Sequence, residues 1–393
     1  MNYKGIGIDT FMCKKVTLQL AVIFLLLLKP SLPAHGQYTL TTGVRYDTFK
    51  DDTAAENRGS EVTFPFSIAY KGDRFAMRVI TAYASSEFDS GDSFVPDASI
   101  SSLTDTLVST SYTLPSLPVG LVFGVDVNLP TGKENLTAEE RRAELGDNNN
   151  LVEIDNFGDG LNLNLNAGLA KQMGEIGLAL GVSYIYRGEY DPTADVPNDD
   201  LDPGDEFSLA SIISLDPTKE VSLTGFIGYV FFKTDQVNGQ DSFREGNKLT
   251  LGADVSFSRV PYRLTVSLQD SFQAKSERIN PATSPVAERE TTNGDQFFAS
   301  INFGYEFSET LTLRAIADTR IFGENDEDST SLFFDAGSTR YSLGPGFSYE
   351  LVKNLYVNGI IKYFTLKEKQ DAQLQEDVTF KGFNLDLGVI YLF

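Results

Sequence analysis

Apolar and polar residues alternate along most of the chain, from Tyr38 to the last residue. The segment EVTFPFSIAY at 61–70, for example, has valine, phenylalanine, isoleucine or tyrosine at every second position. The end of the chain, FNLDLGVIYLF at 383–393, follows the same rule and finishes on Phe393. Because a period of two places successive side chains on opposite faces of a strand, the pattern predicts many β-strands, each with one apolar face.

The alternation divides the chain into sixteen predicted strands joined by two kinds of connection. Short turns such as KGD at 71–73 and SET at 308–310 alternate with longer polar loops. Short turns on one side and long loops on the other are typical of transmembrane barrels. The predicted strands are 38–49, 60–70, 74–87, 105–114, 120–129, 161–172, 176–190, 206–215, 221–232, 247–257, 262–272, 295–307, 311–321, 338–349, 355–365 and 380–393.

The character of the two strand faces selects a fold class. The faces opposite the apolar ones carry small residues and scattered charges, as a water-filled lumen would. Tyrosines recur near the strand ends, as in the aromatic girdles of outer-membrane barrels. We therefore predict an all-β fold, a transmembrane antiparallel up-and-down β-barrel of about sixteen strands with short periplasmic turns and long external loops. Fourteen or eighteen strands are alternatives, and a secreted protein of several β-sandwiches is the competing interpretation.

The N-terminal segment 1–36 has the features of a secretory signal peptide. Two lysines precede the apolar run VTLQLAVIFLLLL at 16–28, and Ala34-His35-Gly36 offers a small-residue cleavage site. The run is shorter than the roughly 20 apolar residues of a transmembrane helix. We predict cleavage after Gly36 and a barrel over 37–393 in the outer membrane of a Gram-negative cell, with an uncleaved anchor as the alternative.

The last strand ends on aromatic residues. Tyr391 and Phe393 resemble the C-terminal signal that outer-membrane barrels present to the barrel-assembly machinery. A closed barrel has no free edge, so this last strand is expected to pair with the first.

Composition restricts the chemistry. The one histidine, His35, and the one cysteine, Cys13, both lie in the predicted signal peptide. Without them the mature chain has no imidazole base, thiol nucleophile, disulfide or His/Cys zinc site, so we expect neither an enzyme nor a cofactor or metal. The net charge is −23, and much of the acidic excess lies in predicted external loops such as 198–206 and 324–329. A nucleic-acid partner is not expected.

The longest connection, 130–160, follows the fifth predicted strand. Thr137-Ala-Glu-Glu140 fits a capping box, which predicts a short helix over 138–145. In sixteen-stranded porins the loop at this position folds inward and narrows the pore, so this loop is a candidate constriction. An external, solvated loop is the alternative. The candidate constriction residues are Glu134, Glu139, Glu140, Arg141, Arg142 and Glu144.

Charged residues at lumen-facing positions of the strands form a candidate pore lining. A ring or ladder of such charges sets the selectivity of a channel. The alternative is mutual neutralisation, for example of Arg314 and Arg320 by Asp318. The candidate pore-lining residues are Arg45, Arg74, Arg78, Arg187, Arg263, Arg314, Asp318, Arg320, Arg340 and Lys362.

One family resemblance rests on the segment VGLVFGVDVNLPTGKENL at 119–136 and on the terminal GVIYLF. The strand followed by LPTG resembles outer-membrane transporters associated with the meta-pathway of phenol degradation. The resemblance implies uptake of small aromatic or apolar compounds and transfers no binding residues.

These observations favour a porin-like outer-membrane channel for passive diffusion of small solutes. The alternatives are a facilitator for small aromatic or apolar compounds, guided by lumen aromatics such as Phe226, Phe298 and Phe364, and a structural or adhesive barrel closed by its loops. The expected partners are outer-membrane lipid and lipopolysaccharide, the barrel-assembly machinery, small-molecule solutes and a second copy of the chain in a homo-oligomer.

Overall fold

The structure is a computed structural model of the 393-residue chain. It describes residues 36–92, 94–114, 119–145, 151–154, 156–197, 200–280, 283–287, 294–325, 327, 329–330, 334–370 and 376–393. The predicted signal peptide, up to residue 35, and part of the predicted turn 115–119 lie outside the described residues.

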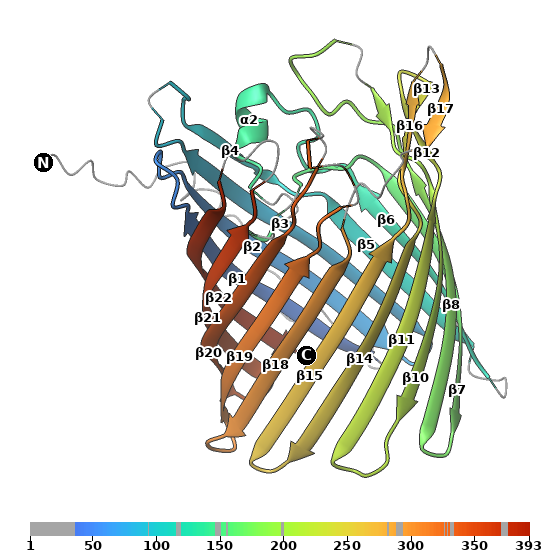
Figure 1. The fold of residues 1–393 in the computed structure, drawn as a ribbon. Coiled ribbons are helices and arrows are strands. Elements are labelled where there is room, and N and C mark those ends of the chain that lie inside the picture. Colours follow the sequence, from blue (N-terminus) through green and yellow to red (C-terminus); the bar gives the residue numbers. More distant parts are fainter. Residues whose placement is uncertain are drawn as a thin grey trace, which may run out of the picture. The chain divides into compact units, whose positions relative to one another are not determined.

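The strands form one closed antiparallel barrel (Figure 1). The main sheet contains seventeen strands, of which β4 and β5 both pair with β3 and together make one wall strand, so the wall has sixteen. The first strand pairs with the last from Thr39↔Leu392 to Lys50↔Lys381, which closes the barrel as expected. The wall strands are β1 (Gly36–Lys50), β2 (Arg58–Gly72), β3 (Phe75–Asp89), β4 (Ala98–Leu103), β5 (Thr106–Leu114), β6 (Gly120–Leu129), β7 (Asn162–Met173), β8 (Ile176–Arg187), β10 (Glu206–Leu215), β11 (Val221–Phe232), β14 (Lys248–Arg259), β15 (Tyr262–Gln273), β18 (Gln296–Glu306), β19 (Leu311–Phe322), β20 (Ser338–Val352), β21 (Leu355–Glu368) and β22 (Val378–Leu392).

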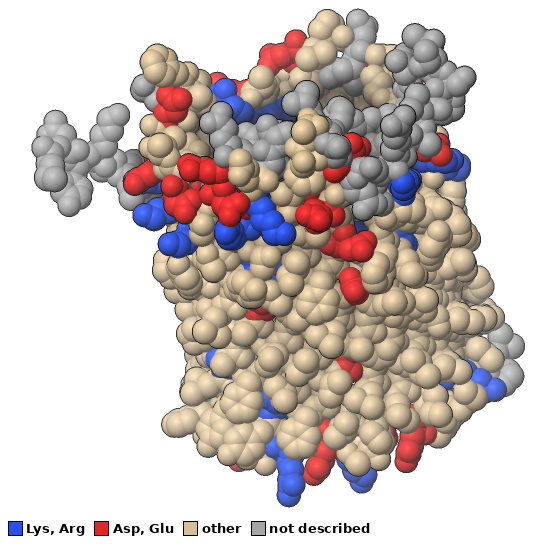
Figure 2. All heavy atoms as spheres, viewed as in Figure 1, with Lys and Arg blue, Asp and Glu red and all other residues tan. Residues whose placement is uncertain are grey.

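The outer face of the wall is apolar. Figure 2 shows a broad uncharged band, with the charged residues gathered at its two ends. Outward side chains such as Leu180 and Leu343 stay exposed at 57% and 63%, as side chains that contact lipid would. Several of the predicted girdle tyrosines, including Tyr186 and Tyr262, are likewise exposed on this face. The alternation along the sequence therefore separates a lipid-facing side from a lumen-facing side.

The predicted strand 105–114 is longer in the structure. Its wall strand begins at Ala98 as β4, is interrupted at Thr104 and Asp105, and continues as β5. The register on β3 shifts by one residue there, from Tyr83↔Leu103 to Ile80↔Leu107, which is a β-bulge. The segment ASISSL of β4 has too few apolar residues to show a clear alternation, so the sequence pattern missed it.

A second sheet lies at the end of the barrel that carries the long loops, which we take as the external end (Figure 1). Its strands extend two hairpins of the wall and were not predicted, because each is short and embedded in a polar loop. They are β9 (Leu201–Asp202), β12 (Thr234–Val237), β13 (Gln240–Arg244), β16 (Glu277–Asn280) and β17 (Thr283–Ala287).

The helix α2 spans Ala138–Arg142 and is shorter than the predicted 138–145. Its capping box is present as predicted, because Thr137 accepts from the Glu140 backbone and the Glu140 side chain accepts from the Thr137 backbone. Within the described part of the chain, no helix has the length and apolarity needed to cross a membrane.

Candidate functional site

The loop between β6 and β7 turns into the barrel and buries apolar side chains there. Leu145, Leu151 and Val152 from this loop form one buried cluster with inward side chains of the wall. Their wall partners are Phe49 on β1 and Phe364 and Leu366 on β21. Burying one such side chain contributes about 1.5–3 kcal/mol, so this cluster holds the loop firmly against the wall.

A second buried cluster holds the beginning and the end of the same loop. Leu136, Ala143 and Phe157 pack on Ala84 of β3 and on Ala98 and Ile100 of β4. Phe157 is fully buried. The loop thus rests on β3 and β4 at one side and on β1 and β21 at the other.

Polar contacts fix the innermost part of the loop. Glu61 on β2 is fully buried, and its Oε1 accepts from the Ile154 backbone N–H at 3.1 Å and from the Thr63 hydroxyl at 3.1 Å. Next to it, Arg45 on β1 forms an ion pair with Glu153 and another with Asp47 at 2.9 Å. The loop therefore reaches the wall through a backbone amide and a carboxylate as well as through apolar contacts.

The root of the loop is built around Asp105, the residue at the bulge between β4 and β5. Its carboxylate accepts from the Gly132 N–H at 2.9 Å, the Asp159 N–H at 2.9 Å and the Asn128 side-chain amide at 2.7 Å. A Cβ at Gly132 would lie 1.8 Å from the Phe157 carbonyl oxygen, so only glycine fits between the two ends of the loop. The glycine of the LPTG segment thus has a structural role in the inward course of the loop.

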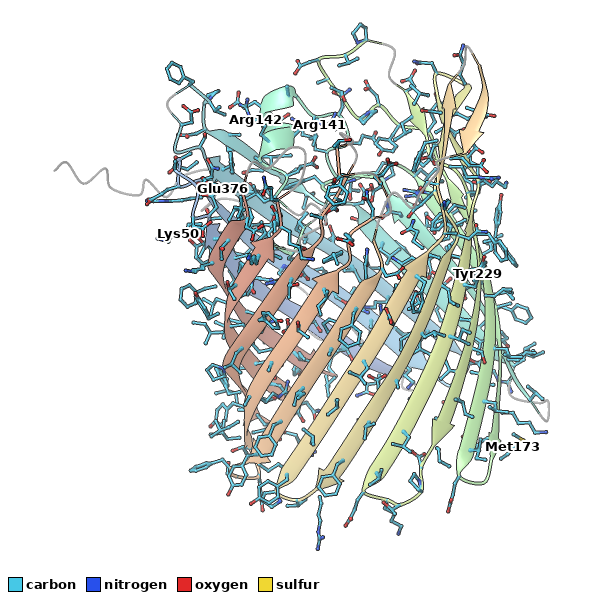
Figure 3. The ribbon with its side chains drawn as sticks, viewed as in Figure 1. Lys50, Arg141, Arg142, Met173, Tyr229 and Glu376 are labelled. Atoms are coloured by element: carbon cyan, nitrogen blue, oxygen red, sulfur yellow. The ribbon has the colours of Figure 1, made fainter. Side chains whose placement is uncertain are left out.

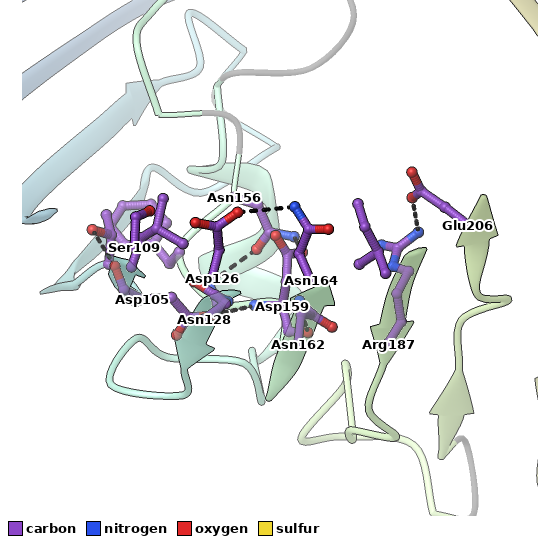
Figure 4. Close-up of a pocket in the computed structure, with 15 residues that line it drawn as sticks. Asp105, Ser109, Asp126, Asn128, Asn156, Asp159, Asn162, Asn164, Arg187 and Glu206 are labelled. Carbon is purple, nitrogen blue, oxygen red and sulfur yellow. Dashed lines mark hydrogen bonds and ion pairs between the residues drawn. The ribbon is translucent and has the colours of Figure 1, made fainter. Parts of the chain in front are cut away.

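A cavity of about 530 Å³ lies between the infolded loop and the wall strands β5, β6, β7, β8 and β10 (Figure 4). Four of its lining residues carry carboxylates, four carry side-chain amides and one carries a guanidinium. Asp126 accepts from Asn164 at 3.0 Å and from Asn166 at 3.1 Å, and Arg187 donates to Glu206 at 3.3 Å. The lining residues are Thr104, Asp105, Leu107, Ser109, Asp126, Asn128, Asn156, Phe157, Gly158, Asp159, Asn162, Asn164, Ile185, Arg187 and Glu206.

Two loop carboxyls at this site are held in a partly dehydrated environment. Burial raises the pKa of Asp159 above its ordinary value, against the attraction of Arg187, and the neighbouring Asp105 adds to the rise. Burial likewise raises the pKa of Glu144, against a hydrogen bond from the Phe157 backbone. Both carboxyls therefore take up protons more readily in the folded loop than in water.

The opposite wall carries the basic residues. Arg340 on β20 donates to Asn384 at 2.8 Å, and Asn384 donates to the buried Asp47 at 2.6 Å. Lys362 on β21 pairs with Asp318 on β19 at 2.9 Å. In wall order β19 to β21 are the thirteenth to fifteenth strands and β6 to β8 the fifth to seventh, so the two groups lie across the barrel from each other. The lumen thus has a basic side facing a side of carboxylates and amides.

The candidate pore-lining residues are distributed as follows. Arg74 lies in the exposed turn between β2 and β3 rather than on a strand, because β3 begins one residue later, at Phe75. Arg263 pairs with Glu306 at the end of β15 that joins the short turns, and its side chain is 65% exposed. Arg263 and the others occupy lumen-facing positions in the wall, and Arg263 lies on the same rung as Arg314. These residues are Arg45, Arg78, Arg187, Arg263, Arg314, Asp318, Arg320, Arg340 and Lys362.

The candidate constriction residues on α2 lie at the external rim, where Figure 3 labels Arg141 and Arg142. Glu139 and both arginines are exposed, and Glu140 forms an ion pair with Lys133. Glu134 and Glu144 lie beside the infolded segment and are partly buried.

The residues that enter the lumen instead follow α2. Sequence reasoning missed them, although Leu145, Leu151, Val152 and Phe157 form an apolar group in an otherwise polar loop, which was a usable signal.

Comparison with known sequences settles the family. Residues 32–277, more than half of the chain, match the family described as "Putative MetA-pathway of phenol degradation". The chain belongs to this family. No curated protein sequence matches the chain. The closed antiparallel barrel with an apolar outer face has the architecture of a Gram-negative outer-membrane protein.

The chain also resembles several solved structures in architecture. OccK7 (OpdD) of Pseudomonas aeruginosa is 12% identical, with 92% of this chain and 99% of that chain covered and a TM-score of 0.46. The toluene transporter TodX of P. putida is 11% identical, with 92% and 90% covered and a TM-score of 0.38. OccAB3 of Acinetobacter baumannii is 10% identical, with 92% and 100% covered and a TM-score of 0.45. These scores are too low to support an inference about the function of this chain.

Proposed function

We propose that this channel passes small hydrophilic solutes by passive diffusion through the polar cavity under the infolded loop. One observation carries the proposal: nine of the fifteen residues that line the cavity carry a carboxylate, an amide or a guanidinium. A solute that enters must lose water, and these groups replace the lost hydrogen bonds. An apolar solute would leave them without partners, which costs about 1–3 kcal/mol for each buried group.

The opposed sides of the lumen would sort solutes by charge and dipole. The cavity has four carboxylates, Asp105, Asp126, Asp159 and Glu206, against one base, Arg187. Across the lumen lie Arg320, Arg340 and Lys362. A field between two such sides orients a dipolar solute and admits both a cationic and an anionic end.

A second candidate function is uptake of small aromatic compounds. The family description names phenol degradation. Phe157 is the one aromatic residue among those that line the cavity, but its side chain is fully buried in the loop and offers no open ring. Of the lumen aromatics suggested by the sequence, Phe364 is fully buried beneath the loop and Arg340, and Phe298 lies under Arg320. The Phe364 ring is therefore closed to solutes, whereas the rings of Phe226 and Phe298 are only partly buried and remain candidates for a short aromatic surface in the lumen.

Transport assays separate the two functions. The protein would be placed in liposomes and tested for swelling in arabinose or glycerol and for uptake of radiolabelled phenol. We expect swelling with the polyols, and we expect substitution of Asp126 and Asp159 by leucine to reduce it. Uptake of phenol without any swelling would favour the second function. No swelling, no phenol uptake and no conductance in a planar bilayer would indicate a barrel closed by its loops.

Three further expectations are proposals of the same kind. The mature chain would begin at Gln37 after removal of the signal peptide, and the barrel-assembly machinery would recognise Tyr391 and Phe393. The protein would act as a channel and not as an enzyme.

A further inference from the structure

A row of basic side chains crosses the outer surface at the external border of the apolar band. Lys367 on β21, Lys381 on β22, Lys50 on β1 and Arg58 on β2 come from four consecutive wall strands. On each strand the buried, lumen-facing positions are the alternate ones, such as Phe49, Gly59, Leu366 and Gly382. All four bases are exposed and face outward, and Figure 2 shows bases gathered at this border with acidic residues directly beside them.

The register brings these charges close together. Lys50 lies directly opposite Lys381 in the closing pair of strands. The Asp51 N–H donates to the Asn57 carbonyl at 3.0 Å, which places Lys50 beside Arg58 across the β1–β2 hairpin. Like charges directly opposite each other on one face of a sheet are destabilising. Asp52, whose carboxylate accepts from the Thr379 N–H, attracts Lys381, whereas no ion pair of Lys50 is present in the described part of the chain. An external anion beside Lys50 would therefore relieve the repulsion that remains.

The acidic residues next to this row of bases lie in the adjoining loops or on β3. Asp377 pairs with Lys367 at 2.6 Å, and Glu56 approaches Arg58 at 3.6 Å. The side chains of both pairs are 46% to 63% exposed, and such exposed pairs are worth little. A ligand phosphate could therefore take over Lys367 and Arg58 without a large loss.

The surface on the membrane side of this row is suited to acyl chains. Phe383, two residues below Lys381, is 49% exposed and stacks edge-on with Tyr363 of β21 at 5.2 Å. Leu385 and Leu387 continue the exposed apolar face of β22 below it. A row of bases next to aromatic rings and an apolar strip matches a ligand with anionic headgroups and hydrocarbon tails.

We infer that Lys50, Arg58, Lys367 and Lys381 form a binding site for the phosphate groups of a phosphorylated glycolipid of the outer leaflet, the lipid A part of lipopolysaccharide. The lysines bind the phosphates, and the acyl chains lie on the Tyr363–Phe383 strip. The site is on the outer face of the wall, so it does not depend on which solute crosses the lumen.

The test uses the full-length protein in detergent and purified Kdo2-lipid A as the probe. Native mass spectrometry would measure binding to the parent, to Lys50→Glu/Lys381→Glu, and to the matched control Lys219→Glu/Lys353→Glu, whose lysines lie in exposed short turns. We expect the first double variant to bind roughly tenfold more weakly or worse, and the control to bind like the parent. Heat-modifiable migration and single-channel conductance confirm that each variant is folded.

Two further measurements sharpen the test. The first measures binding of dephosphorylated lipid A to the parent, which should be as weak as binding of intact lipid A to the double variant. The second raises the salt concentration, which should weaken binding of intact lipid A to the parent. Equal binding of intact and dephosphorylated lipid A would overturn the inference. So would an unchanged lipid affinity combined with a changed oligomeric state of the double variant, since the row would then be a contact between two copies of the chain.

Discussion

The Asp105 carboxylate accepts the backbone N–H of Gly132 at 2.9 Å, and this contact joins a bulge in the barrel wall to the first residues of the infolded loop. The same carboxylate accepts the Asp159 N–H at the other end of the loop. One side chain thus holds both ends of a loop of about thirty residues, and loop closure of this length carries a sizeable entropy cost. The position of the loop depends on a few residues at its root.

Adding a methyl group at Gly132 should displace the loop. In Gly132→Ala the new Cβ would meet the Phe157 carbonyl oxygen at 1.8 Å, so the two ends of the loop must separate. We expect a larger or noisier single-channel conductance in a planar bilayer. Gly181→Ala is the matched control, because its Cβ finds its nearest neighbour at 3.9 Å on the same inner surface. Equal conductance of Gly132→Ala and the parent would show that this junction does not set the pore width.

Removing the Glu61 carboxylate should release the innermost part of the loop. Glu61→Ala leaves the partly buried Ile154 N–H without its acceptor, which costs up to about 1–3 kcal/mol. Glu61→Gln keeps an acceptor for Ile154 and should behave nearly like the parent. Two measurements compare the variants: the unfolding temperature from circular dichroism, and the noise of the single-channel current in a planar bilayer. If Glu61→Gln lowered the unfolding temperature or raised the current noise more than Glu61→Ala, the anchoring role of Glu61 would be contradicted.

Acid should favour the infolded position of the loop. Burial raises the pKa of Asp159 and of Glu144 in the folded loop, whereas a released loop would titrate near the ordinary values of about 3.9 and 4.3. The infolded state therefore binds more protons, and its advantage is complete below the ordinary values and is lost as pH rises through the raised ones. We expect smaller or quieter currents at pH 4.5 than at pH 7.5.

Variants distinguish these two carboxyls from the other acids of the lumen. The double variant Asp159→Asn/Glu144→Gln should show the small, quiet currents of low pH also at pH 7.5. Its currents should therefore change little between pH 4.5 and pH 7.5. Asp254→Asn, at a lumen-facing position of β14 away from the loop, serves as the control. An unchanged pH response in the loop variant would assign the effect to other groups.

The basic wall should set ion preference. Arg340 stacks over Phe364 with 4.3 Å between the guanidinium carbon and the ring centre, and Arg320 lies 5.4 Å from the Phe298 ring. Replacing Arg314, Arg320 and Arg340 by alanine removes three positive charges from one side of the lumen. We expect the reversal potential in a salt gradient to move toward cation preference. Arg74→Ala/Arg259→Ala is the control, since both arginines lie at the end with short turns. If the triple variant keeps the parental reversal potential, these arginines do not contribute to the selectivity filter.

The strand pattern was readable from sequence because each wall strand alternates over about ten residues against a lipid phase. Strands β6, β10 and β11 have the predicted bounds, 120–129, 206–215 and 221–232. The inward course of the loop was not decided, because its apolar residues find their partners far along the chain. Leu145 meets Phe49 and Phe364, and neither neighbour follows from local periodicity.

Buried acids were also beyond the sequence pattern. Glu61 and Asp47 occupy lumen-facing positions, which predicts contact with water. The infolded loop covers Glu61, and a network through Arg45 and Asn384 encloses Asp47, so both are fully buried. Only the tertiary position of the loop distinguishes such residues from the water-exposed lining.

Deleting Phe393 should weaken closure of the barrel as well as recognition during assembly. Phe393 exchanges backbone hydrogen bonds with Tyr38 at 2.8 and 3.0 Å, so it forms the last rung between the first and last strands. Its ring stacks with the rings of Tyr38 and Tyr391, with ring centroids 5.4 Å and 5.3 Å apart, and the Tyr38 ring in turn lies 4.9 Å from that of Tyr70.

Two variants separate the ring from the backbone pairing. Phe393→Leu keeps the backbone hydrogen bonds to Tyr38 and loses only the stacked ring, whereas deletion of the residue loses both. Heat-modifiable migration of membrane fractions measures assembly in the cell, and refolding of urea-denatured protein into detergent measures closure without the assembly machinery. We expect the deletion to impair both and Phe393→Leu to impair mainly assembly in the cell. Normal assembly of the deletion variant in the cell would show that neither the ring nor the rung is needed.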